Sequence, residues 1–112
     1  LHHAAQVMRD VQNSLFHLHP QGTIILHDCK PQDEASQIVP RRQFHWNGDC
    51  WKVIVTLRAT RSDLSVYTLD TDEGLGIVTW AVGDRALIPD PGELTWEKLV
   101  ENRETWLGLV QP

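Results

Sequence analysis

The first regular pattern along the chain is a run of apolar positions spaced three and four residues apart. The residues that recur at these steps are Ala4, Met8, Val11, Leu15 and Leu18. Polar side chains separate them, so the spacing predicts an amphipathic helix over residues 4–18 with one buried face. The segment Pro20-Gln21-Gly22 comes directly afterwards and ends the helix in a tight turn.

A short apolar run, Thr23-Ile24-Ile25-Leu26, comes after the turn. It does not alternate with polar residues, which is typical of a strand buried on both faces, as parallel strands flanked by helices are. Residues 29–46 are then polar and contain two prolines, which predicts a long surface loop. Connections of that length carry function more often than short ones do.

The segment Trp51 to Ala59 fits two patterns. Its apolar residues alternate as in a strand, and they also share one helical face. Asn47 and Asp49 precede it and are good N-cap and first-turn residues, which favours a helix.

The remaining elements are a hairpin and a final helix. Residues 65–69 and 75–82 read as two strands joined by an acidic turn that ends in Gly74, so we expect an antiparallel pair. Thr95 is suited to cap a last helix. The apolar stripe of that helix consists of Trp96, Leu99, Val100, Trp106, Leu107 and Val110. The predicted order is α-β-α-β-β-α, in an α/β fold.

Composition narrows the class of protein. The chain has 112 residues, of which 41% are hydrophobic and 22% charged, so we expect a single small folded domain over residues 1–112. No apolar run reaches the roughly 20 residues that cross a bilayer, and no charged-then-apolar signal begins the chain. These features predict a cytoplasmic protein. Cys29 and Cys50 are too few for a disulfide scaffold and are expected to be reduced thiols.

Charge argues against a nucleic-acid partner. The formal net charge is -5, and the acidic excess lies in the second half of the chain, where we expect a solvated face. Only Arg41-Arg42 brings two basic residues together, whereas tracking phosphates requires clustered Lys and Arg. The pair either meets an anionic group of a ligand or is ordinary solvated loop charge.

Four stretches in order resemble bacterial class I methyltransferases that use S-adenosylmethionine. Leu1-His2-His3 with the helix behind it resembles the family segment that comes directly after a strand ending in Asp-Gly. Gly22 to Cys29 resembles the next strand with its His-Asp ending. Trp46 to Lys52 and Asp70 to Gly76 resemble the start of the next helix and the closing hairpin.

The resemblance implies the C-terminal half of a Rossmann-like methyltransferase domain that acts on a small or sugar-like molecule. In that family fold the hairpin lies beside the strand Thr23–Leu26, which gives a three-stranded mixed sheet with helices packed on it. The family's glycine-rich cofactor loop has no counterpart here, because Gly74-x-Gly76 sits inside the hairpin and is a turn device. We therefore expect no cofactor for the isolated chain, and S-adenosylmethionine only if a partner completes the site.

His27 and Asp28 are the candidate catalytic residues, because ligands gather outside the carboxyl ends of strands in open α/β sheets. His27 is suited to act as a general base, and the pair is alternatively suited to ligate a hard divalent cation or to cap backbone donors. We assign no metal. His2 matches the family's His after Asp-Gly and is a candidate substrate contact. His17 and His19 lack an evident third metal ligand.

The segment around residues 45–51 is the densest polar and aromatic patch. Its candidate substrate-binding residues, together with Arg42 from the preceding loop, are His45, Trp46, Asn47, Asp49 and Trp51. Aromatic faces stack on sugars or flat rings, and the polar side chains hydrogen-bond hydroxyls. The alternative is a capped helix start with tryptophan packing. Trp80, Trp96 and Trp106 are expected in the core or an interface.

Two functions are consistent with these expectations. The first is a non-catalytic module of methyltransferase ancestry that binds a small polar or sugar-like ligand. The second is the substrate side of an active O-methyltransferase whose cofactor half lies upstream or on another chain. In the family fold the strand Thr23–Leu26 pairs on its other edge with a strand that this sequence lacks. An apolar strand with an open edge tends to pair, so we expect a homo-oligomer, such as a dimer.

Overall fold

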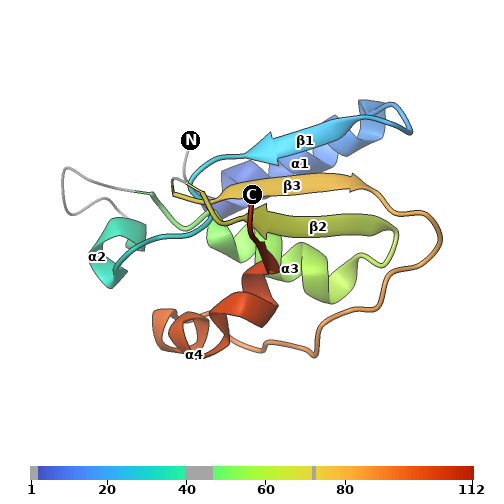
Figure 1. Cartoon of the computed structure of the whole chain (residues 1–112). Coiled ribbons are helices and arrows are strands. Elements are labelled where there is room, and N and C mark those ends of the chain that lie inside the picture. The colour runs from blue at the N-terminus through green and yellow to red at the C-terminus, as the bar shows by residue number, and fades with distance from the viewer. Residues whose placement is uncertain (1–2, 40–46, 72) are drawn as a thin grey trace.

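The computed structural model describes residues 3–39, 47–71 and 73–112. Its helices are α1 (Ala4–His17), α2 (Glu34–Gln37), α3 (Trp51–Thr60) and α4 (Trp96–Leu107). Its strands are β1 (Thr23–Leu26), β2 (Leu64–Leu69), β3 (Leu75–Trp80) and β4 (Leu109–Val110) (Figure 1). The α/β class and the predicted succession of elements are confirmed, with α2 and β4 added to it.

The four strands form one mixed sheet in the order β1-β3-β2-β4. The hairpin of β2 and β3 is antiparallel, as predicted, and β1 pairs antiparallel with β3. The predicted count of three strands is wrong, because β4 adds a short parallel pairing with β2. The hairpin therefore lies beside β1, and β1 forms one edge of the sheet.

The expectation that β1 is buried on both faces is wrong. Ile24 and Leu26 pack against the core, whereas Thr23 and Ile25 are exposed, Ile25 to 55%. The physical reason is the position of β1 at the sheet edge. Its side chains alternate between the two faces, and the core lies on one of them.

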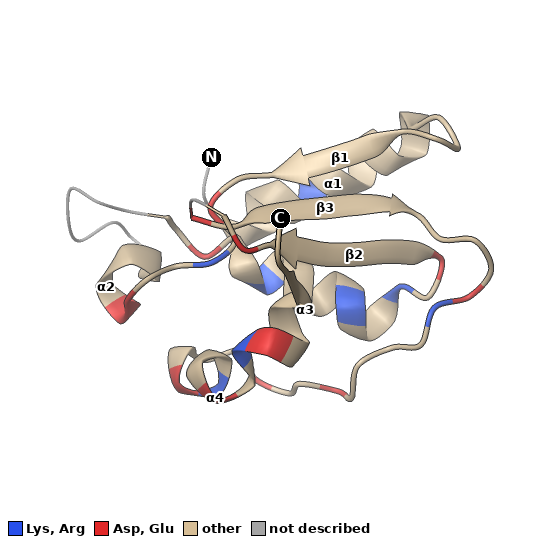
Figure 2. Cartoon of the chain, in the orientation of Figure 1, with Lys and Arg blue, Asp and Glu red and all other residues tan. Residues whose placement is uncertain are grey.

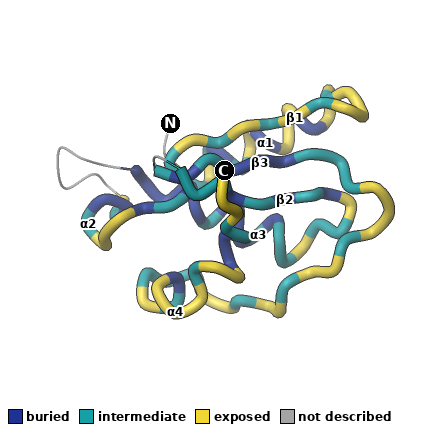
Figure 3. The backbone as a smooth tube through the Cα atoms, viewed as in Figure 1, coloured by how far each residue is buried: buried dark blue, intermediate teal, exposed yellow. Residues whose placement is uncertain are grey.

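One hydrophobic core joins all three long helices to the sheet. α1 and α3 lie against the same face of the sheet (Figure 1), and both helices contribute buried residues to the core. Figure 3 shows further buried positions in the strands and in α4. Trp51 of α3 stacks on Trp106 of α4, with ring centroids 6.2 Å apart and an interplanar angle of 16°. The fully buried large side chains of the core include Trp51, Ile54, Leu64, Leu99 and Leu107.

The predicted surface loop after β1 contains an ordered helical turn. α2 begins at a capping box in which Asp33 accepts a hydrogen bond from the backbone of Ser36. Ser36 and Gln37 are buried, and the Ser36 carbonyl accepts from the amide of Asn47 at 2.6 Å. This part of the chain is therefore attached to the start of α3.

The end of α4 differs from the predicted stripe. Thr95 caps the helix as expected, because its hydroxyl oxygen accepts a hydrogen bond from the Lys98 amide. The helix stops at Leu107 because Gly108 adopts a left-handed conformation with φ 58°. Val110 therefore belongs to β4, and the Gly108 carbonyl accepts from the Thr68 amide of β2.

Charged residues are distributed unevenly over this framework. Acidic positions mark α4 and the segment before it, whereas Lys and Arg are scattered over several elements (Figure 2). Within the described ranges, none of the helices has the length and apolar character needed to cross a membrane.

Candidate functional site

A cleft of about 470 Å³ lies at the carboxyl end of β1, between that strand, α1 and the start of α3. Its lining residues are Val7, Asp10, Ile25, Leu26, His27, Asp28 and Cys50. The cleft therefore combines an imidazole and two carboxylates with an apolar wall. Both residues predicted as catalytic, His27 and Asp28, line it.

Asp28 has the unusual backbone of this site. Its φ angle is 60°, and among the described residues it is the single non-glycine residue with a positive φ. Aspartate tolerates this region better than most residues, yet holding it there costs about 1 kcal/mol. The turn places His27 in an exposed position and Asp28 in a half-buried one directly after the strand.

The chain beyond Asp28 is held against the hairpin turn. The Cys29 amide donates to the Gly74 carbonyl at 3.0 Å, and the Lys30 amide donates to the Glu73 carbonyl at 2.7 Å. Gly74 has φ +86°, and a side chain there would meet the Lys30 backbone nitrogen at 2.7 Å. This close approach requires glycine, which supports the interpretation of Gly74-x-Gly76 as a turn device.

Both cysteines are buried and free, as predicted. Burial, with the nearby Asp49 carboxylate as a second cause, raises the pKa of the Cys50 thiol to about 12. Burial also raises the pKa of Cys29, and the neighbouring Cys50 adds to the effect. The thiol that lines the cleft is therefore protonated at neutral pH and is a weak nucleophile there.

Asp49 directly precedes the cleft residue Cys50 and joins two helices. Its Oδ1 accepts from the Ala4 amide at the start of α1 at 2.7 Å, and its Oδ2 lies 3.2 Å from the Lys52 ammonium. The expected capping of α3 does not occur, because Cys50 occupies that position without a side-chain bond. Asp49 thus caps α1 from 45 residues away, and both of its oxygens have protein partners.

Trp51 and Asn47 lie in the interior rather than at a substrate lip. Trp51 is fully buried, and its indole nitrogen donates to the Gln37 side chain at 3.1 Å. This burial removes Trp51 from the candidate substrate contacts. Asn47 is 1% exposed, and within the described part of the chain its Oδ1 has no hydrogen-bond partner.

Four of the candidate substrate contacts, His2, Arg42, His45 and Trp46, lie outside the described residues. Their proposed roles stay predictions from the sequence.

Asp10 and Cys50 line the cleft, and the sequence patterns do not predict them as site residues. Asp10 sits beside the buried stripe of α1 and accepts a hydrogen bond from Gln6 at 2.9 Å. The signal that could have identified it is an acidic residue next to the apolar face of a helix that precedes a strand. Cys50 adjoins the predicted patch, but its sequence context predicts only a reduced thiol.

The described residues contain no group of three or more His, Cys, Asp or Glu side chains placed to hold a metal ion. His27 and Asp28 supply at most part of a coordination shell, and hydrogen bonding is the chemistry that their present arrangement supports. The carboxylates accept from hydroxyl groups, and the imidazole accepts or donates one proton.

Comparison of the chain with protein-family models, with curated proteins and with solved structures finds no match in any of the three.

Proposed function

We propose that this chain is a methyltransferase-like C-terminal half-domain that binds a small polar, sugar-like ligand in the cleft at the carboxyl end of β1. On its own it carries out no methyl transfer. The observation that carries the proposal is the His27-Asp28 pair, because a left-handed Asp directly after a strand is strained and lines the cleft. Strain of this kind is concentrated at functional sites.

The chemistry of the cleft favours a hydroxyl-rich ligand. Asp10 of α1 and Asp28 after β1 both line the cleft, and His27, which lines it too, is exposed. Val7 and Ile25 supply the apolar surface that the C–H face of a sugar packs on. Carboxylate oxygens accept hydrogen bonds from hydroxyl groups, so a neutral polyol matches the polar side chains that line this cleft.

A second candidate function is the substrate side of an active methyltransferase whose cofactor half is supplied separately. Its specific support is the open edge of β1. α1 lies behind the sheet in Figure 1, so a right-handed crossover through α1 would place a parallel strand along that edge. This is the side on which the resembled fold has a further strand.

Calorimetric titration of the chain tests the proposed function. We expect heat from at least one member of a panel of neutral monosaccharides, and none from S-adenosylmethionine. Heat from S-adenosylmethionine, or methyl transfer after a cofactor-binding half is added, would favour the second candidate. A panel that gives no heat at all would contradict the proposed ligand class.

Two variants locate the binding in the cleft. His27→Asn removes a hydrogen bond of about 1 kcal/mol or more, which lowers monosaccharide affinity about fivefold or more. His17→Asn is the matched control, because His17 is an exposed histidine at the end of α1. We expect that control to bind as the wild type does.

A further inference from the structure

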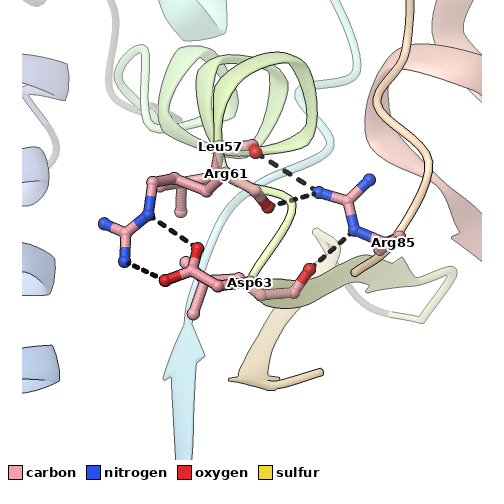
Figure 4. A network of polar contacts seen from close by, with 5 residues as sticks. Leu57, Arg61, Asp63 and Arg85 are labelled. Atoms are coloured by element: carbon pink, nitrogen blue, oxygen red, sulfur yellow. Dashed lines mark hydrogen bonds and ion pairs between the residues drawn. The ribbon is translucent and has the colours of Figure 1, made fainter. Parts of the chain in front are cut away.

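At the outer edge of β2, each of the residues Leu64, Val66 and Thr68 has a hydrogen-bond partner. The Leu64 carbonyl accepts from Arg85 Nε at 2.6 Å, and the Val66 carbonyl accepts from Arg58 Nη1. The Thr68 amide donates to the Gly108 carbonyl at 3.1 Å, next to the pairing with β4. Figure 4 shows Arg85 reaching from its loop to carbonyls at the end of α3 and at the start of β2.

These bonds determine which backbone groups point outward from β1. In antiparallel pairs, successive residues direct their N–H and C=O groups to opposite sides. The Val66 carbonyl and the Thr68 amide point away from β3. The backbone groups of Tyr67, which lies between them, therefore point toward β3 and bond to Ile77, its partner in register. Val78 then bonds to Ile24, and Thr23 and Ile25 direct their backbone groups to the open edge.

The β1 edge is short, at four residues, and within the described structure it carries no charged residue, proline or bulge. Its sequence, Thr23-Ile24-Ile25-Leu26, contains no charge, proline or glycine. Edges of native sheets are commonly protected by lysine, proline or a bulge, and an unprotected edge pairs with another strand. The Ile25 side chain is 55% exposed. Among the described strands, β3 pairs with β1 on one side, and no strand pairs with β1 on the other.

We propose that a second copy of this chain occupies this edge, with the two β1 strands antiparallel about a twofold axis at Ile25. In this register Ile25 of the two copies form a hydrogen-bonded pair, and Ile24 of each copy lies opposite Leu26 of the other. Antiparallel pairing places opposite residues on one face, so each apolar residue meets an apolar residue. The result is a continuous eight-stranded sheet, two sets of the four strands observed here.

The neighbouring register is less favourable. An axis at Ile24 would also match the outward backbone groups, but it would pair Ile25 with Thr23 and Leu26 with Gly22. That arrangement leaves two apolar side chains opposite small or polar ones. The axis at Ile25 therefore buries more apolar surface for the same backbone bonds.

The dimer also completes the cleft. The proposed register places Thr23 of the second copy opposite His27, so the second copy forms one wall of the site described above. The pairing itself rests on the geometry of the edge and is independent of which ligand binds.

Sedimentation velocity over a concentration series tests the pairing. We expect the wild type to be a dimer and Ile25→Lys to be a monomer, since the lysine places charge on the twofold axis. Val82→Lys is the matched control, because Val82 is fully exposed and lies outside the strands. It should remain a dimer. A monomeric wild type, or an Ile25→Lys variant that stays dimeric, would overturn the proposal.

The register is tested by isotope-filtered nuclear Overhauser measurements on a dimer mixed from labelled and unlabelled chains. We expect an intermolecular contact between methyl groups of Ile24 and Leu26. A contact between the two Ile24 side chains without that signal would place the axis one residue earlier and overturn the proposed register.

Discussion

At the scale of single residues, the role of Asp28 decides between two interpretations of the end of β1. The segment is either a ligand site or a strand end that only supports the fold. The left-handed backbone of Asp28 is the type of conformation that glycine adopts without strain. If Asp28 served mainly to cap neighbouring backbone donors, removing its side chain would destabilise the fold. If the Asp28 side chain instead contacts a ligand in the cleft, its removal leaves the fold stable and weakens ligand binding.

We predict that Asp28→Gly leaves the free energy of unfolding within about 1 kcal/mol of the wild-type value, because relief of backbone strain offsets the greater freedom of the unfolded chain. Monosaccharide binding should be lost in the same variant. Urea unfolding and calorimetry measure the two effects. A loss of stability above about 2 kcal/mol would show that the carboxylate supports the fold instead.

The buried thiols predict a pH dependence of stability. The folded pKa of Cys50 is raised to about 12, so the folded state retains its proton where the unfolded state has lost it. The stabilisation is complete below the unfolded pKa of about 8.5 and is lost as pH rises toward 12. We expect the unfolding free energy to fall above pH 8.5, by up to about 1.4 kcal/mol per pH unit for each thiol.

Cys50→Ala is the control for this effect, measured by urea unfolding between neutral and alkaline pH. Its stability is lower at neutral pH, since it leaves a cavity, but its decline with pH should be shallower than that of the wild type. Parallel declines in the two proteins would show that other groups cause the dependence.

At the scale of elements, Arg85 connects the loop after β3 to α3 and β2. Its guanidinium donates to the carbonyls of Leu57, Arg61 and Leu64, and burial lowers its pKa. The Leu57 and Arg61 carbonyls lie at the end of α3, and the Leu64 carbonyl lies at the start of β2. A single side chain thus satisfies acceptors that neither element can satisfy internally.

We predict that Arg85→Ala lowers the free energy of unfolding by about 2 kcal/mol, because hydrogen bonds to a charged donor are lost. Arg61→Ala is the matched control. Arg61 makes two bonds to Asp63, yet that pair is exposed and should contribute less than about 1 kcal/mol (Figure 4). Urea unfolding measures both, and equal losses would contradict the assigned role of Arg85.

The elements that the sequence predicts well are those with a local signal. Three such signals are the spacing of apolar residues in α1, the turn at Gly74 and the cap at Thr95. In each case the residues that carry the signal lie within a few positions of the structure that they determine. Asn47 and Asp49 favour a helix over residues 51–59, and the structure forms α3 there. Periodicity alone does not decide between helix and strand in that segment.

The features that the sequence does not predict depend on contacts distant along the chain. The side-chain bond from Asp49 to Ala4 spans 45 residues, so the residue expected to cap the next helix instead holds the first one. The position of β1 at the edge of the sheet gives Ile25 its exposure, and no property of its own four residues reveals that. Trp51 similarly points inward because it stacks on Trp106 and donates a hydrogen bond to Gln37 there.

At the scale of the whole molecule, the described residues give the sheet one closed edge, at β2 and β4, and one open edge, at β1. Arginine side chains and β4 satisfy the outer side of β2, while β1 presents its backbone beside the cleft that His27 and Asp28 line. The proposed ligand site and the proposed dimer interface therefore adjoin. Pairing at the edge would shape the site, and the second candidate function would fill the same edge with a strand from a cofactor-binding half.

The most direct test of the central claim is a titration of the ¹⁵N-labelled chain with neutral monosaccharides, monitored by amide NMR. We expect the shifted signals to cluster at His27, Asp28, Cys29 and Cys50, with no such cluster when S-adenosylmethionine is added. Shifts that gather elsewhere on the molecule, or amides around residues 27–29 that do not respond to any monosaccharide, would contradict the assignment of the cleft as a sugar-binding site.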